Sequence, residues 1–156
     1  MIFFAQRRRE RGGALRPIDD ITRDVIGIAM HIHRELGPGL LESVYEMVLA
    51  AKLHRLGYRV DRQRQINMEF DGLRFEAAFR IDILVDERLI VEIKSVEQIH
   101  KVHAKQLLTY LRLTRQPVGL ILNFGAETMR EGIRRLVNNH NDSASSAPLR
   151  EQIITE

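Results

Sequence analysis

Residues 79–95 read FRIDILVDERLIVEIKS, which is two apolar runs separated by a polar break at residues 86–88. Each run has the length and the β-branched content of a strand, and the short break favours antiparallel pairing of the two strands. Asp82 nevertheless interrupts the first run, and Glu92 interrupts the second. An ionised carboxylate among apolar residues lowers stability unless it is paired or bound to a metal, so both positions require a compensating partner.

Strand geometry brings these charged residues together. Side chains alternate along a strand, so Glu92 and Lys94 point to the same face of the sheet. Antiparallel pairing across residues 86–88 places Asp82 beside Glu92. Two carboxylates this close repel each other unless a divalent cation neutralises them, and oxygen ligands of this kind suit Mg²⁺. Such a site can polarise a phosphodiester, while Lys94 could orient or deprotonate the attacking water or stabilise transition-state charge.

A simpler arrangement accounts for the same residues. Glu92 and Lys94 could form a solvated ion pair on the outer face of the hairpin, which contributes little free energy. The chain contains four lysines and twenty arginines, so lysine at position 94 is a minority choice. Lysine can change its protonation state and arginine effectively cannot, which favours a chemical role for Lys94.

Helical spacing of apolar residues precedes the two strands. It covers about residues 19–36 and about residues 40–56, with Gly37-Pro38-Gly39 between them. Asp19 or Asp20 can cap the first of these helices, because a short acidic side chain accepts hydrogen bonds from the free N–H groups of a first turn. The chain therefore opens its folded part with a helical pair.

The remaining elements follow from turn residues and apolar periodicity. Asp71-Gly72 has hairpin-turn chemistry and joins a strand over about 58–70 to the strand over about 74–85. Apolar spacing then predicts a helix at about 100–114, a strand buried on both faces at 118–122 and a last helix at about 127–137. This order predicts an α/β fold with a mixed central β-sheet of about four core strands flanked by α-helices.

Charge is distributed unevenly along the chain. The formal net charge is +3, but residues 1–16 carry five arginines and one acid, so the other 140 residues sum to −1. We expect residues 1–16 to form a basic flexible arm, which either holds a phosphate backbone or is an extension without a role. Residues 140–156 are expected to form a polar tail, which leaves one domain over 17–139.

Composition excludes some classes of protein. A chain of 156 residues with 44% hydrophobic content can enclose one core. Cysteine is absent, which removes disulfides, thiolate metal sites and cysteine nucleophiles. No apolar run approaches the roughly 18 residues of a membrane span. We therefore expect a cytoplasmic protein without a membrane partner.

Two further groups of polar residues lie on the expected helices. Glu42 and Tyr45 are at the start of the second helix, where the helix dipole favours a carboxylate in any case. His103, Gln106 and Tyr110 are spaced three and four apart, so they share one face of the helix at 100–114. That face is either part of a site or the ordinary exposed side of an amphipathic helix.

Taken together, these residues resemble the PD-(D/E)xK nuclease superfamily. Asp82 followed by Glu92-Ile93-Lys94 matches its D…ExK core, although Ile81 stands where the superfamily name has a proline. The segment GLLESVY at residues 39–45 matches the signature of a small bacterial branch, the GxxExxY proteins. Further matching blocks extend the likeness over about residues 19–138; they lie at 33–39, 106–112 and 119–125.

The resemblance implies a restriction-endonuclease-like sheet that carries a metal site. By this likeness Asp82 and Glu92 are catalytic ligands of Mg²⁺ (or Mn²⁺), with the Ile93 carbonyl as a candidate third ligand. Lys94 is by the same likeness the catalytic lysine. Glu42 is implied as an additional catalytic acid and as a candidate metal ligand.

The resemblance also implies substrate contacts. Gln106 and Tyr110 match a Q…Y pattern that contacts substrate beside the metal in related nucleases, and Tyr45 and His103 are candidates for the same role. The expected function is hydrolysis of DNA by a metal-activated water. The alternative is a non-catalytic nucleic-acid-binding or protein-interaction module, because the domain without its arm is slightly acidic. A homodimer could supply a composite groove for nucleic acid.

Overall fold

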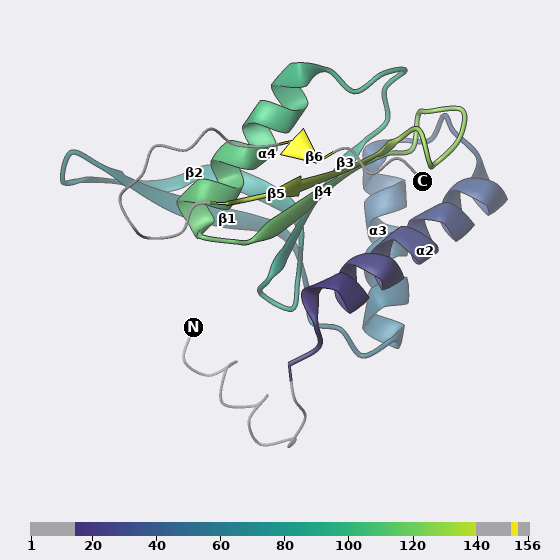
Figure 1. The fold of residues 1–156 in the computed structure, drawn as a ribbon, viewed down its shortest axis with the longest axis horizontal. Helices are drawn as coiled ribbons and strands as arrows, with labels where there is room; N and C mark the ends of the chain where they lie inside the picture. The colour runs from purple at the N-terminus through teal and green to yellow at the C-terminus, as the bar shows by residue number, and fades with distance from the viewer. Residues whose placement is uncertain (1–14, 140–150, 153–156) are drawn as a thin grey trace.

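The computed structural model describes residues 15–139 and 151–152, which form three helices and one six-stranded sheet (Figure 1). The strands lie in the order β1-β2-β3-β4-β5-β6; β3 and β4 are parallel and every other neighbouring pair is antiparallel. The expected mixed α/β sheet is confirmed, with two strands beyond the four expected. In chain order the elements are α2 (Ile18–Leu36), α3 (Glu42–Arg55), β1 (Val60–Phe70), β2 (Leu73–Val85), β3 (Leu89–Lys94), α4 (Lys101–Thr114), β4 (Val118–Asn123), β5 (Ile133–Val137) and β6 (Glu151–Gln152).

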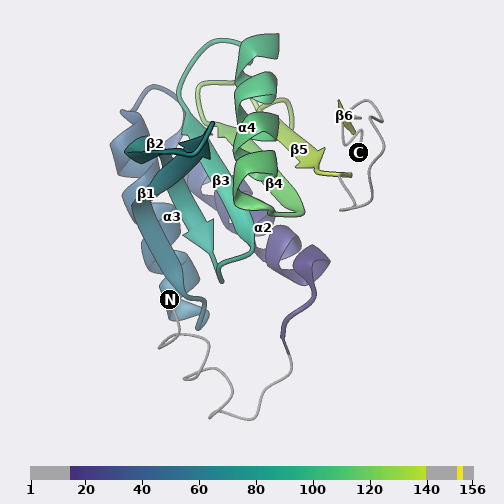
Figure 2. The same ribbon diagram turned by 90° about the vertical axis from the view of Figure 1, so that its left-hand side faces the viewer.

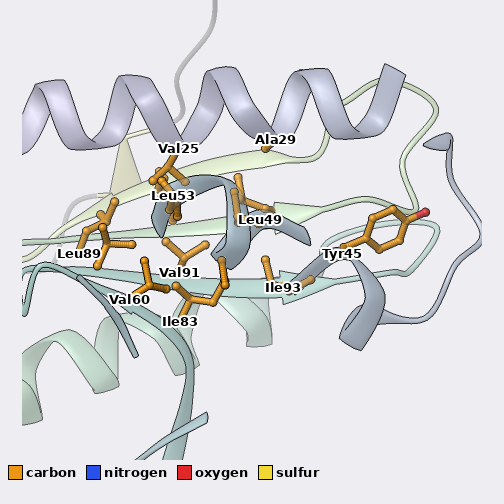
Figure 3. Packing of buried hydrophobic residues seen from close by; sticks show 14 of the residues in the cluster. Val25, Ala29, Tyr45, Leu49, Leu53, Val60, Ile83, Leu89, Val91 and Ile93 are labelled. Carbon is orange, nitrogen blue, oxygen red and sulfur yellow. The ribbon is translucent and has the colours of Figure 1, made fainter. Parts of the chain in front are cut away.

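The sheet separates two helical layers. Helices α2 and α3 cover one face, and α4 covers the other (Figures 1 and 2). Alternate residues of β3 belong to different cores: Val91 and Ile93 pack with α2 and α3, whereas Ile90 packs with α4. Figure 3 shows the first of these cores, in which side chains of α2 and α3 meet those of the sheet. Because side chains alternate, Glu92 and Lys94 lie on the face of β3 that carries α4.

The expected cap of the first helix is wrong. Helix α2 begins at Ile18 with Pro17 at its N-cap, and no side chain caps it. Asp19 and Asp20 lie inside the first turn, where their negative charges interact favourably with the positive end of the helix dipole. Proline is well suited to this boundary because it has no N–H group to satisfy.

The expected last helix at 127–137 is also wrong. Residues 133–137 form β5, which pairs with β4 from Val118–Val137 to Leu122–Ile133. The chain turns back tightly before this strand, since a Cβ atom on Gly132 would come within 2.2 Å of the Asn123 carbonyl oxygen. The open edge of β4 thus offers backbone hydrogen bonds that outweigh a weak helical pattern.

The expected arm and tail fall largely outside the described residues. Arg16 is described: its guanidinium lies 4.1 Å from the centre of the Tyr58 ring and donates to the Leu56 carbonyl at 3.1 Å. The last arm residue therefore contacts the folded part of the chain. Within residues 140–156, the backbone of β6 pairs with β5. No helix in the described part of the chain is both long and apolar enough to cross a membrane.

Tyr45 supports the loop that leads into α3. Its ring is fully buried and stacks on Phe124, with ring centres 4.3 Å apart. Its hydroxyl donates to the Gly37 carbonyl and accepts from the Leu40 N–H, at 2.5 and 3.1 Å. Figure 3 shows this hydroxyl at the far end of the apolar cluster, pointing out of it. The expected substrate contact of Tyr45 does not fit this burial.

Replacement of the Tyr45 hydroxyl should weaken the fold measurably. Tyr45→Phe keeps the stacked ring but leaves a carbonyl and an N–H of the loop without their partner. We expect the free energy of unfolding to fall by about 1–3 kcal/mol, measured by urea denaturation. Ser43→Ala, an exposed change in the same helical turn, is the control. Equal stability of Tyr45→Phe and the control would contradict the assigned role.

Candidate active site

Asp82 and Glu92 lie side by side on the two antiparallel strands β2 and β3. Ile83 pairs with Val91, so the next positions along the ladder are Asp82 and Glu92. The Asp82 N–H donates to Glu92 Oε1 at 3.4 Å, and the Ile93 N–H donates to Asp82 Oδ2 at 2.8 Å. The proximity expected from the strand pattern is therefore confirmed.

Burial and like charge make the Glu92 carboxylate costly. Glu92 is only 7% exposed. Burial, followed by the charge of the neighbouring Asp82, raises the pKa of Glu92 to about 8, and Lys94 acts in the opposite direction. Within residues 15–139, no lysine or arginine forms an ion pair with Asp82 or Glu92. The solvated Glu92–Lys94 ion pair is therefore not the arrangement found.

This donor set fits a divalent cation held by two carboxylates. A hard cation such as Mg²⁺ is usually bound through one or two carboxylates and completed by water and phosphate oxygens. Asp82 and Glu92 supply those two groups, and no basic side chain in the described part of the domain forms an ion pair with them. Among the residues described, no three His, Cys, Asp or Glu side chains gather closely enough to hold a metal. Glu42 thus does not join the pair as a third carboxylate ligand in this arrangement.

Glu42 lies at the end of β3, next to the residue that follows Lys94. Glu42 Oε1 accepts the Ser95 N–H at 3.3 Å, and the Ser95 hydroxyl donates to the Leu40 carbonyl at 2.8 Å. Glu42 is also the first residue of α3, where the helix dipole favours its charge. Glu42 can thus be both a first-turn residue favoured by the helix dipole and a member of the site. Helix α3 brings its exposed carboxylate to the Lys94 end of the site.

Tyr110 on α4 approaches the carboxylate pair from above the sheet. Its ring stacks on Phe79 of β2, with centres 4.4 Å apart. Burial raises the pKa of Tyr110, the charges of Glu92 and Asp82 raise it further, and a hydrogen bond with Gln106 lowers it. These interactions require Tyr110 to lie near both carboxylates and Gln106 to lie beside Tyr110.

His103 occupies the same face of α4, about two turns before Tyr110. Burial lowers the pKa of His103, the positive charge of Lys94 and the neighbouring His100 lower it further, and Glu42 opposes them. His103 Nδ1 accepts the His100 N–H at 3.2 Å, which caps the start of the helix. The face of α4 that carries these polar residues therefore lies near the charged groups of the site and is not simply the exposed side of an amphipathic helix.

Asn123 and Gly125 hold the segment that follows Lys94, and the sequence analysis did not identify them. The Asn123 side chain accepts the Val96 and Gly125 N–H groups at 3.0 and 3.1 Å and donates to the Val96 carbonyl at 2.9 Å. The Phe124 N–H donates to the Lys94 carbonyl at 2.8 Å. A Cβ atom on Gly125 would lie 2.4 Å from the Val96 carbonyl oxygen. An asparagine at the end of a fully buried strand was the available signal.

A second group of residues that the sequence analysis did not identify lies on the β1 side of the pair. Glu46, one turn after Glu42 on α3, is 4% exposed and accepts Arg62 Nε at 3.0 Å. Gln63 Nε2 donates to Glu46 Oε2 at 2.8 Å and lies 3.5 Å from Asp82 Oδ1. Residues 61–65 of β1 are all polar, so no alternation of polar and apolar residues indicated which side chains face the site.

Comparison with known proteins yields one family. The family model described as PD-(D/E)XK nuclease superfamily matches residues 19–136, a span that contains every site residue described above. No curated protein and no solved structure matches the chain significantly.

The buried carboxylate should make stability fall as pH rises in metal-free buffer. The folded-state pKa of Glu92, about 8, lies above the ordinary value of 4.5, so the native state binds this proton more tightly than the unfolded state. Stability is therefore lost between these two pH values. Glu92→Gln should remove this component and be more stable than the native protein by on the order of 2 kcal/mol at about pH 9.

Urea denaturation with a chelator, at about pH 5 and about pH 9, measures the difference between the two proteins. Glu97→Gln, which changes an exposed carboxylate of the following loop, is the matched control. A native protein and a Glu92→Gln variant with the same pH dependence would show that Glu92 is not held in an unfavourable state.

Proposed function

The chain belongs to the PD-(D/E)XK nuclease superfamily, and we propose that it is a Mg²⁺-dependent (or Mn²⁺-dependent) nuclease that hydrolyses DNA phosphodiester bonds with a metal-activated water. The observation that carries the proposal is the carboxylate pair beside Lys94: Glu92 is buried, Asp82 is half-buried, and no basic side chain of residues 15–139 forms an ion pair with either. Such a pair lowers stability by itself, so its presence is explained by a cation that it binds. The match to the GxxExxY signature at residues 39–45 supports the same assignment.

In the proposed site, the residues of β2 and β3 divide the work between metal binding and catalysis. Asp82 and Glu92 hold the cation, with the Ile93 carbonyl as a further ligand. A divalent cation bound there lowers the pKa of a coordinated water and polarises a phosphate. Lys94, on the same face of β3, orients the attacking water or stabilises negative charge on the phosphate in the transition state. Glu42 contributes a third acidic group, at the Lys94 end of the site.

The proposed substrate contacts come from α4. Tyr110, Gln106 and His103 share the face that looks onto the charged groups, and their hydroxyl, amide and imidazole groups can donate to phosphate oxygens. The five arginines of residues 1–16 would add affinity for the phosphate backbone that does not depend on base sequence. The substrate class most consistent with both features is DNA.

Cleavage assays test the proposed activity. We expect Mg²⁺- or Mn²⁺-dependent nicking or cleavage of supercoiled, linear or branched DNA. Asp82→Ala and Lys94→Ala should each lower the rate by about 100-fold or more, because each removes a group that acts on the reacting phosphate. Lys52→Ala, a lysine on α3 away from the pair, is the control. Equal rates for the native protein and both variants would identify a contaminant and reject the assignment.

Metal binding separates a nuclease from a non-catalytic module. Isothermal titration of the native protein with Mn²⁺ should show binding in the millimolar range or tighter, and Asp82→Asn should abolish it while keeping the side-chain shape. Mn²⁺ should also raise the melting temperature of the native protein and not that of the variant. A native protein that binds no Mn²⁺ would favour the nucleic-acid-binding or protein-interaction module instead.

A further inference from the structure

Gln63 of β1 lies in the same row of the sheet as the carboxylate pair. Arg62 pairs with Ile83 and Arg64 pairs with Ile81, so the position opposite Asp82 is Gln63. Glu92 lies on the other side of Asp82, on β3. The acidic residue at the centre of the site is therefore flanked by a carboxylate on one strand and by a primary amide on the other.

The amide of Gln63 bridges two carboxylates. Its Nε2 atom lies 2.8 Å from Glu46 Oε2 and 3.5 Å from Asp82 Oδ1, so one contact is short and the other is long. A primary amide nitrogen carries two hydrogens, and ionised carboxylates only accept, so one hydrogen is available for each partner. The reverse orientation would direct the amide oxygen at two acceptors, which fixes the assignment of N and O.

Glu46 is held firmly enough to serve as an anchor. Its side chain is 6% exposed, and Arg62 Nε donates to Oε1 at 3.0 Å while Gln63 occupies Oε2. Both Glu46 oxygens therefore have a charged or amide donor. Glu46 is one turn beyond Glu42 on α3, so the same helix reaches the site at two points.

The backbone of Gln63 adopts a conformation that costs free energy. Its φ angle is 52°, in the left-handed region that residues with a Cβ atom rarely occupy, and it lies inside a strand. Such strain persists where surrounding contacts over-determine it, and it is often found at functional sites. Here the strained residue is the one whose side chain contacts both Glu46 and Asp82.

We propose that Gln63 is a positioning residue that orients Asp82 toward the cation, and that Glu46 acts through Gln63. This inference rests on the proposed metal-dependent function. The Ile93 N–H already holds Asp82 Oδ2 at 2.8 Å, so the rotation of the carboxylate is decided at Oδ1. A long contact from Gln63 restrains Oδ1 while leaving a lone pair free for a cation. Residues that orient a metal ligand in this way tune metal affinity without touching the metal.

The test measures Mn²⁺ affinity, by the loss of the free-ion electron paramagnetic resonance signal and by calorimetry. We expect Gln63→Ala to weaken Mn²⁺ binding about 10-fold, the lower end of the usual effect of such residues. Gln63→Gly should weaken it equally while keeping or raising the melting temperature, because glycine adopts the positive φ without strain. Gln65→Ala, two residues along the same strand, is the matched control and should bind Mn²⁺ as the native protein does.

A double-variant cycle tests the route through Gln63. Glu46→Ala should weaken Mn²⁺ binding, and adding it to Gln63→Ala should cause no further loss, because both changes remove the same restraint. Unchanged affinity in Gln63→Ala and Gln63→Gly, with a native protein that binds Mn²⁺, would overturn the positioning role and leave the nuclease proposal intact. Additive losses would overturn the assigned route from Glu46. A native protein without Mn²⁺ affinity would instead reject the proposed function itself.

Discussion

The pairing of β2 with β3 is the constraint on which the rest of the site depends. A three-residue turn at 86–88 joins the strands, with Asp86 and Glu87 both at positive φ, and the Asp86 carboxylate accepts the Arg59 N–H at 2.9 Å. This turn sets the register that puts Asp82 beside Glu92. A slip of one residue would move Asp82 to the face covered by α2 and α3, away from Glu92 and Lys94. The geometry of the carboxylate pair therefore depends on this register.

Three segments far apart in sequence converge on that pair. The start of α3 holds the residue after Lys94 through Glu42, α4 brings Tyr110 over the carboxylates, and the end of β4 clamps the same segment through Asn123. The contacts of Glu42 and Asn123 hold the segment just after β3, and Tyr110 stacks on Phe79 of β2. Because the carboxylates repel each other and are partly shielded from water, this convergence places unfavourable charge in a rigid setting. A rigid anionic setting is what selective binding of a small divalent cation requires.

Much of the fold could be predicted because its elements are locally consistent. The two helices before the sheet, the hairpin at Asp71-Gly72, the strands at 79–95 and the buried strand before Asn123 all follow from period and turn chemistry. The segment at 127–137 could not be predicted in this way. Its residues are compatible with a helix or a strand, and pairing with the open edge of β4 selects the strand. The cap of α2 was misplaced because Pro17 can begin a helix without any side-chain cap.

The amino-acid sequence by itself determined the carboxylate pair and its lysine, because strand alternation and a three-residue break leave few other arrangements. It also indicated the polar face of α4 by helical spacing. Only the tertiary structure decided that Tyr45 is buried and that Gln63 and Glu46 reach the site. The physical reason is distance along the sequence. Strand and helix periods act over a few residues, whereas Gln63 contacts Glu46 and Asp82, which are 17 and 19 positions away on different elements. Their partners are set by packing, which no local pattern specifies.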